Sequence, residues 1–156
     1  MKQFYFLTGL PRAGNTLLGS LVNQNKNVAV TSTDLTVELP VKQLYRSIGI
    51  ASVIDGVRAT NIVNKITLKS GTTVIVQLDA EEIKADNYLA YEVNSSADLD
   101  GIYIIDFLSR GNLSDLLDTI SQYNTLELVF DVTKQSGTND LHIYSDIIDI
   151  KDVVEV

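Results

Sequence analysis

The stretch IVNKITLKSGTTVIVQL, residues 62–78, contains the clearest structural signal in the chain. A polar turn with a glycine, Lys69–Thr72, separates two runs of apolar and β-branched residues. The first run alternates, which places four side chains on one face of an extended chain: Ile62, Asn64, Ile66 and Leu68. Two such runs around a glycine-bearing turn predict an antiparallel β-hairpin.

Further strand signals follow through the second half of the chain. Apolar or alternating runs predict strands at 88–93, 102–107, 125–133 and 141–150. The last two of these runs flank a polar turn, Ser136–Asp140, and form a second candidate hairpin. Near the N-terminus, residues 3–7 and 28–31 have the composition of short strands.

Three segments have helical spacing instead. Residues 40–54 begin at Pro40, which suits the first turn of a helix, and their apolar residues recur every three or four positions. Residues 112–120 begin at the capping residue Asn112 and contain a leucine stripe. The third segment, 15–22, follows a glycine-bearing turn. The acidic run 79–86 suits a loop or a short helix.

These elements predict an α+β fold, a mixed or antiparallel sheet with two or three helices and a βαβ unit as its candidate start. The chain has 156 residues, enough for a single domain, 1–156, with a core of its own. A sub-boundary at 31–40 would separate a short N-terminal segment from the β-rich remainder. Such a segment is too short to fold alone, so it must pack on the rest or on another chain.

Composition sets further bounds. The chain is 45% hydrophobic and 21% charged, which is ordinary for a globular protein. It has no cysteine, which excludes a disulfide framework, thiolate chemistry and cysteine metal sites. No apolar run reaches the roughly 20 residues that a membrane-spanning helix needs. We therefore expect no membrane association and synthesis in the cytoplasm.

The net charge of −8 is distributed unevenly. Residues 1–78 contain eight Lys and Arg against three Asp and Glu, whereas residues 79–156 contain four against 17. A basic half can meet a polyanion, or it can meet the acidic half of another copy in a heterologous contact that builds rings or arrays. Two solvated surfaces that merely differ in charge are the third alternative.

Residues 4–18, FYFLTGLPRAGNTLL, combine an apolar run, a glycine-bearing turn and a helix start. That order points backbone N–H groups at an anion in the turn. Gly9 and Gly14 permit a close approach to it, Pro11 stiffens the turn, and Arg12 can bind an oxyanion with two hydrogen bonds. Asn15 or Thr16 can cap the helix that follows.

This loop resembles the N-terminal loop of sulfotransferases that use the sulfate donor PAPS, where a strand leads into a G-x-P-R-[SA]-G-[ST]-T-L-L motif. The match is similar to short sulfotransferase-like proteins of marine phages and covers about the first 30 residues. The resemblance implies that one loop holds the 5′-phosphosulfate of the donor: Gly9, Pro11, Arg12, Ala13, Gly14, Asn15 and Thr16. Asn15 stands where the family more often has Ser or Thr.

The remainder of the chain departs from that family. An Arg and a Ser usually grip the 3′-phosphate of the donor, and Ser109-Arg110 is the nearest counterpart. The usual catalytic base follows an early strand, but the only histidine, His142, lies near the C-terminus. No catalytic residue is therefore assigned.

Acidic clusters in the second half have a structural explanation. Asp98–Gly101 lacks the further ligands of a calcium loop and is expected to be a solvated loop. Asp146, Asp149 and Asp152 would alternate faces in a strand, so they predict an acidic sheet edge that discourages pairing. No metal site is predicted.

The basic residues and the histidine give equally little evidence of chemistry. Arg46, Arg58, Lys65 and Lys69 have no aromatic residues interleaved with them, so nucleic-acid binding is not expected. His142 is expected to be an exposed histidine on a strand.

Two functions remain. The first is a non-catalytic interaction or assembly protein, such as a phage structural subunit, that needs no cofactor and forms a homo-oligomer or larger assembly through its oppositely charged halves. The second is a PAPS-dependent sulfotransferase-like or phosphate-binding protein that uses the 9–16 loop, so whether the chain is an enzyme stays open. The expected location is the host cytoplasm or, for a phage protein, the virion.

Overall fold

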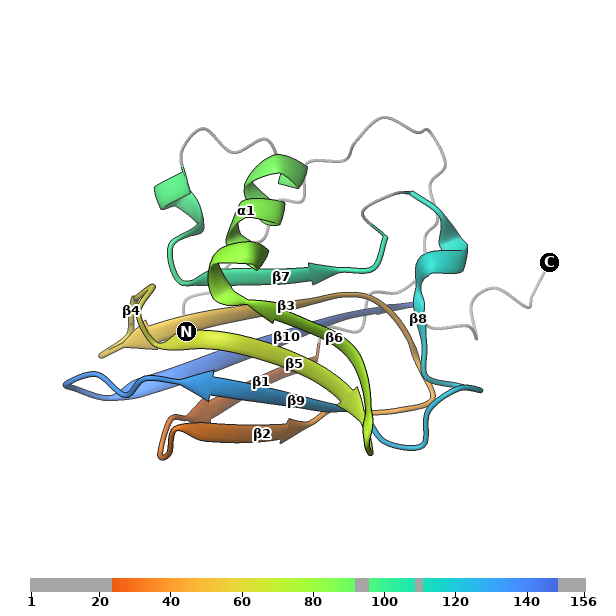
Figure 1. Ribbon diagram of the computed structural model, residues 1–156, viewed down its shortest axis with the longest axis horizontal. Coiled ribbons are helices and arrows are strands. Elements are labelled where there is room, and N and C mark those ends of the chain that lie inside the picture. Colours follow the sequence, from red (N-terminus) through yellow and green to blue (C-terminus); the bar gives the residue numbers. More distant parts are fainter. Residues whose placement is uncertain (1–23, 92–95, 109–110, 149–156) are drawn as a thin grey trace.

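The computed structural model of the chain describes residues 24–91, 96–108 and 111–148, and β-strands predominate in them (Figure 1). The strands form two antiparallel sheets, here sheet A and sheet B, that pack face to face. One α-helix and two short 3₁₀ helices lie among the described residues: α1 (Ala80–Tyr91), η1 (Ser96–Leu99) and η2 (Leu113–Asp115).

Sheet A is built around one long strand. β3 pairs with β10 along one edge and with β8, β7 and β4 in succession along the other, while β1 pairs with the far edge of β10. The strands of sheet A are β1 (Gln24–Ala29), β10 (Asn139–Ile148), β3 (Leu44–Ile54), β4 (Val57–Arg58), β7 (Ile102–Asp106) and β8 (Leu117–Asp118).

Sheet B has four strands in the order β2-β9-β5-β6. Its strands are β2 (Asp34–Glu38), β9 (Glu127–Val132), β5 (Val63–Ser70) and β6 (Thr73–Asp79). β5 and β6 are the two halves of the predicted hairpin, and Ser70 pairs with Thr73 beside the turn. The hairpin prediction is therefore confirmed.

The strand pairs are nested along the chain. β1 pairs with β10, β2 with β9, β3 with β7, and β5 with β6, so each pair encloses the next one. Along the chain, successive strands of these pairs lie alternately in sheet A and sheet B, except that β5 and β6 both lie in sheet B. Eight strands wound in this way form a jelly roll.

A single apolar cluster fills the space between the sheets. Ile48 and Ile143 from sheet A and Leu128 and Phe130 from sheet B are at most 1% exposed. β10 alternates strictly between buried and half-buried residues, because every second side chain of a strand points inward. Burial of both inner faces is the main stabilising contribution to this architecture.

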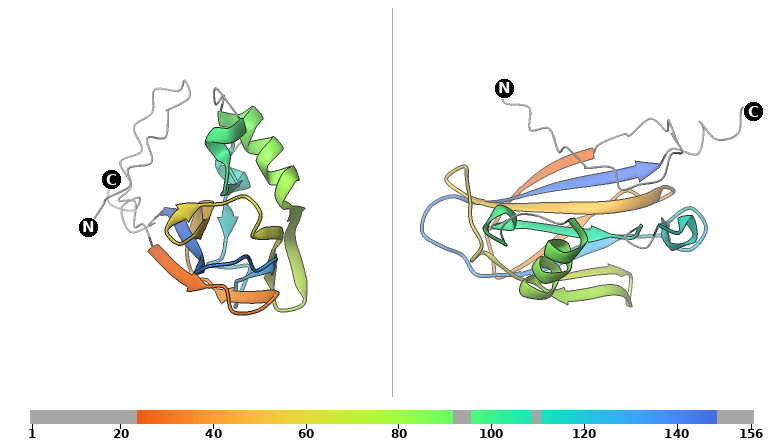
Figure 2. Two further views of the ribbon diagram at one scale, coloured as in Figure 1. Left: turned by 90° about the vertical axis from the view of Figure 1, so that its left-hand side faces the viewer. Right: turned by 90° about the horizontal axis from the view of Figure 1, so that it is seen from above.

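The helix α1 covers one side of the sandwich (Figure 2). It begins directly after β6, and the backbone N–H of Asp79 donates to Oε2 of Glu82 over 2.9 Å, one half of a capping box. α1 contacts β5, β6 and β7 and buries Ala80, Ile83 and Asn87. The prediction of a short helix within 79–86 is confirmed, whereas the predicted strand at 88–93 is wrong because α1 continues to Tyr91.

The predicted helix at 40–54 is also wrong, because this segment forms β3. Its helical spacing was coincidental. Ile48, Ile50 and Ser52 all face the core at spacing two, and the polar Ser52 hid this alternation. The β-branched isoleucines and Gly49 also favour a strand over a helix.

The predicted helix at 112–120 is reduced to η2 and the two-residue strand β8. Leu117 pairs with Tyr45 of β3, a long-range contact that overrides the local leucine stripe. The Asp118 carboxylate then accepts the backbone N–H of Ile120 over 2.7 Å. This local hydrogen bond competes with the backbone hydrogen bonds that a helix would make. The predicted α+β fold with two or three helices is therefore wrong, and the described residues form a β-sandwich with one α-helix.

The other strand predictions can be compared directly. Those at 102–107, 125–133 and 141–150 correspond to β7, β9 and β10. The second candidate hairpin is wrong, because β9 lies in sheet B and β10 lies in sheet A. The predicted strand 28–31 overlaps the end of β1. The candidate βαβ start, with its strand at 3–7 and helix at 15–22, lies outside the described residues.

Candidate functional site

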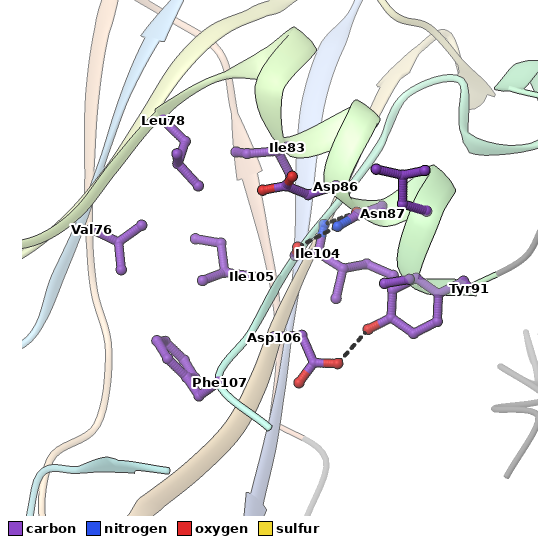
Figure 3. A pocket seen from close by; sticks show the side chains of 12 residues that line it. Val76, Leu78, Ile83, Asp86, Asn87, Tyr91, Ile104, Ile105, Asp106 and Phe107 are labelled. Atoms are coloured by element: carbon purple, nitrogen blue, oxygen red, sulfur yellow. Dashed lines mark hydrogen bonds between the residues drawn. The ribbon is translucent and has the colours of Figure 1, made fainter. Parts of the chain in front are cut away.

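A groove of about 490 Å³ opens on the side of the sandwich where α1 lies between β6 and β7 (Figure 3). Val76 and Leu78 of β6 face Ile105 of β7 and Phe107, which directly follows β7, across it. Ile105 is buried, whereas the other three side chains are half-buried. The groove therefore presents an apolar surface at the open side of the core.

One wall of the groove contains a buried amide, Asn87 of α1 (Figure 3). Its Nδ2 donates to the carbonyl oxygen of Ile104 over 2.7 Å, and its Oδ1 accepts the N–H of Ile104 over 2.7 Å. Asn87 thus makes the two hydrogen bonds that a neighbouring strand would make. The outer edge of β7 is closed at this point by a side chain.

A second contact between α1 and β7 lies at the end of the groove. The Tyr91 hydroxyl donates to Oδ2 of Asp106 over 2.8 Å, and Oδ1 of Asp106 accepts the N–H of Leu108 over 2.8 Å. Burial and the hydrogen bond to Asp106 raise the pKa of Tyr91, so the phenol stays protonated and acts as a donor.

The same polar row continues across sheet A. Arg46 of β3 forms an ion pair with Asp146 of β10, with Nε and Oδ2 3.1 Å apart. Burial raises the pKa of Asp146, and nearby Asp106 adds to this, while Arg46 opposes it. The Oδ1 atom of Asp146 is buried and has no hydrogen-bond partner among the described residues. These contacts link α1 to β7 and β3 to β10, and they leave one buried carboxylate oxygen of Asp146 without a hydrogen-bond partner among the described residues.

The groove is suited to binding by burial of apolar surface. Its polar side chains are Asp86, Asn87, Tyr91 and Asp106, and the last three are occupied in holding α1 to β7. Across the described residues, no group of three His, Cys, Asp or Glu side chains is arranged to hold a metal ion.

The residues of the predicted phosphate loop cannot be placed. Gly9, Pro11, Arg12, Ala13, Gly14, Asn15 and Thr16 lie outside the described residues, as do Ser109 and Arg110. The loop therefore stays a prediction from sequence.

The acidic clusters have a different environment from the one expected. Asp100 accepts a hydrogen bond from Nζ of Lys84 over 2.7 Å, so the calcium-like loop is tied to α1. Asp146 pairs with Ser47 of β3 in the register and forms an ion pair with Arg46. Asp149 and Asp152 lie outside the described residues, so the acidic edge stays a prediction. His142 is on a strand as predicted but is half-buried rather than exposed, with Asn27 and Ala51 as its neighbours in the register.

The four basic residues singled out in the sequence contact acceptors within the chain. Arg46, Lys65 and Lys69 pair with Asp146, Asp79 and Glu127. Arg58 donates to the carbonyl oxygen of Asp98 over 3.0 Å. Strands from the basic half and the acidic half lie side by side, so their charges meet within one chain.

Sequence analysis missed the groove and Asn87. The sequence signal was that Asn87 directly follows the acidic run 79–86. A helix that begins in this run and extends by one more turn includes Asn87. Its partner, Ile104, is 17 residues away and could not be inferred from local spacing.

Comparisons with known proteins identify the fold. No protein-family model matches the chain, and no curated protein matches it in sequence. Among solved structures, the chain is similar to the major capsid protein P2 from bacteriophage PM2, with a TM-score of 0.54 and 20% sequence identity over 83% of this chain and 45% of that one.

Two further structures are from a turreted icosahedral virus of Sulfolobus. The STIV MCP has a TM-score of 0.60 and 16% identity over 88% of this chain and 44% of that one. A chain from the atomic structure of the virus has a TM-score of 0.61 and 16% identity over 81% of this chain and 37% of that one. The chain therefore has the fold of these proteins and spans less than half of their length.

Proposed function

We propose that this protein is a structural subunit that assembles with other copies of itself into a viral shell, such as that of a phage, and that its place is the virion. The observation that carries this proposal is the nested jelly-roll winding, which matches chains from two viruses over 81–88% of this chain. At 16–20% identity the likeness concerns the fold, and the assembly role is our inference from it.

The surface chemistry of the described residues is consistent with this role. The groove is apolar and open, and the polar side chains beside it hold secondary structure in place. Large apolar side chains are exposed on β6 and on the last turn of α1, which is typical of a surface that contacts another protein.

The contact between copies need not use the oppositely charged halves. Three of the four ion pairs among the described residues join a cation of residues 1–78 to an anion of residues 79–156 within one chain. These cations are already partly neutralised, so we base the assembly proposal on apolar surface and strand edges instead.

The test is an assembly assay with the full chain. Purified protein is concentrated at low and at high salt and followed by light scattering and negative-stain electron microscopy. We expect regular particles of uniform size that dissociate on dilution. A chain that keeps the mass of one copy at every concentration and salt would contradict the proposal.

A second function rests on the loop Gly9–Thr16 and its resemblance to sulfotransferases. If this loop binds phosphate, PAP, the desulfated product of PAPS, should bind at low salt in a calorimetric titration, and Arg12→Ala should abolish the binding. Arg58→Ala is the matched control, because it removes an arginine elsewhere. Equal heats for wild type and Arg12→Ala would contradict this function.

A further inference from the structure

β6 is an edge of sheet B, and among the described residues it pairs only with β5. Its sequence, TVIVQLD, combines β-branched and apolar residues and contains no lysine or proline. A strand edge of this kind presents unpaired N–H and C=O groups that can pair with another strand. β6 is therefore ready to accept one.

Three other sheet edges in the described part of the chain, β7, β2 and β1, are protected, and the edge strands β4 and β8 have only two residues each. Asn87 occupies the outer edge of β7 at Ile104. β2 is five residues long with Asp34 and Glu38 at its ends, and the polar sequence of β1, QNKNVA, includes Lys26. Short, charged or covered edges are the usual protection against unwanted pairing. β6 has only a bulge between its partners Leu68 and Lys69, which leaves Val76–Asp79 regularly paired with β5.

Exposed apolar side chains lie on both faces of the same edge, because Val74 shares the outer face of sheet B with Lys69, whereas α1 lies on the face of Val76 and Leu78. Four of the six large apolar side chains that are exposed among the described residues lie on β6 and α1: Val74, Tyr88, Leu89 and Tyr91. Val74 is 53% exposed and Leu89 is 76% exposed. The groove lies between these two elements and β7 (Figure 3).

We propose that β6 pairs antiparallel with β6 of a second copy, so that the two B sheets become one continuous sheet and the apolar groove and the end of α1 are buried beside it. The contact is isologous, because the same edge contributes from both copies. Main-chain hydrogen bonds provide the pairing and the exposed apolar side chains provide burial.

Charge distribution along β6 selects both the second copy and the antiparallel direction. Asp79, Glu81 and Glu82 make the C-terminal end of β6 acidic, with Lys65 paired to Asp79 alone, whereas the start of β6, Thr73–Val76, carries no charge. Antiparallel pairing sets the acidic end of each copy against the uncharged start of β6 in the other. Parallel pairing would stack the acidic ends within a few ångströms, which is unfavourable. A strand of seven residues keeps the two acidic ends roughly 20 Å apart.

This inference concerns one pair of copies and does not depend on a closed shell. Particles that persist when β6 is altered would leave the proposed function standing and overturn the β6 contact. Pairs that form through β6 without any particles would support the β6 contact and contradict the proposed function.

The experiment measures self-association of the full chain by sedimentation at several concentrations. Two substitutions of opposite charge at one exposed position, Val74→Glu and Val74→Lys, test whether residue 74 of one copy faces the acidic end of the other. Val74 is 53% exposed, so the Val74→Glu subunit stays folded, but the glutamate adds an acid that faces the acidic end of the second copy. Val57→Glu is the matched control, since Val57 is 70% exposed on β4.

We expect wild type and Val57→Glu to form the pair equally, and Val74→Glu to weaken the pair about tenfold or more. Val74→Lys should weaken it less than Val74→Glu. Hydrogen exchange of residues 73–79 should slow as concentration rises in wild type and not in Val74→Glu.

Four results would overturn the proposal. These are a single copy at every concentration, association that Val74→Glu leaves unchanged, equal weakening by Val74→Glu and Val74→Lys, and concentration-dependent protection at β1 or β2 in place of β6. A different protein strand that occupies β6, found as protection of residues 73–79 only on addition of a partner, would also overturn it.

Discussion

The β6 and β7 edges lie on the same side of the sandwich and are treated in opposite ways. β7 has an amide from α1 on its outer edge and a tyrosine bonded to its last residue, whereas β6 has an open outer edge in the described part of the chain. α1 lies between these two strands in the sequence, and its side chains Asn87 and Tyr91 bond to β7. The comparison shows that the side chains of one helix can close one sheet edge while the neighbouring edge stays open to pairing with another strand.

The largest effect should come from removing the side chain that closes β7. Asn87→Ala leaves the N–H and C=O of Ile104 without partners, which we expect to lower the free energy of unfolding by about 3 kcal/mol. Denaturant titration measures this loss, and hydrogen exchange should speed up at the Ile104 amide. Asp86→Ala, an exposed neighbour, is the control. A loss below about 1 kcal/mol with unchanged exchange would show that β7 does not need the amide.

Substitution of two glycines compares the turns that lead into β7 and β6. Gly101 precedes β7 with φ of 70°, and a Cβ there would lie 2.8 Å from the carbonyl oxygen of Ala59. Gly71, in the turn before β6, has φ of 56° and open space around its Cβ position. We expect Gly101→Ala to cost about 2 kcal/mol or more and Gly71→Ala about 1 kcal/mol. Equal losses in thermal or denaturant unfolding would contradict the close packing at Gly101.

A smaller effect should follow from removing one hydroxyl. Tyr91→Phe deletes the donor to Asp106 while keeping the ring, and Tyr91 is 38% exposed. We expect a loss of about 0.5–1 kcal/mol in the free energy of unfolding. Tyr88→Phe, on the same helix and 42% exposed, should change little. If the two variants lose the same amount, the Tyr91–Asp106 bond does not stabilise the β7 edge.

The smallest effect should be a change of pH dependence in the polar row that ends at β7. Burial raises the pKa of Asp146, so between its unfolded and folded pKa values the folded chain holds more protons than the unfolded one. Stability from this group is therefore present below the unfolded pKa and declines as pH rises through the folded pKa.

Asp146→Asn removes that decline. Relative to wild type, the variant should become more favourable as pH rises from about 3 to about 7, as measured by denaturant unfolding at each pH. A difference between the two proteins that stays constant over this range would show that the Asp146 carboxyl titrates normally.

Local patterns predicted the elements whose own sequence shows a strand period or a hairpin turn. The β5–β6 hairpin was predictable because a glycine-bearing turn joins two β-branched runs. β9 and β10 were predictable because their inward residues alternate with polar ones. Even the acidic start of α1 was visible in Asp79 and Glu82.

The errors occurred where distant partners decide the structure. β3 was mistaken for a helix because one inward position is Ser52, whose hydroxyl bonds to Ala59 and Gly101. Leu117 was assigned to a helix because its partner, Tyr45, lies far along the chain. The groove could not be predicted for the same reason: it exists only when β6, α1 and β7 meet.

The nested winding also has a consequence for folding. The outermost pair joins Gln24 to Ser145, and β10 is the strand that sits between β1 and β3. Contacts so distant in sequence make the loop-closure cost of folding high and the folding slow. Sheet A cannot close until β10 has left the ribosome, so a nascent chain without β10 lacks a completed sandwich. The winding therefore delays folding of the sandwich until β10 has been synthesised, and it restricts self-association through folded surfaces to chains in which β10 is in place.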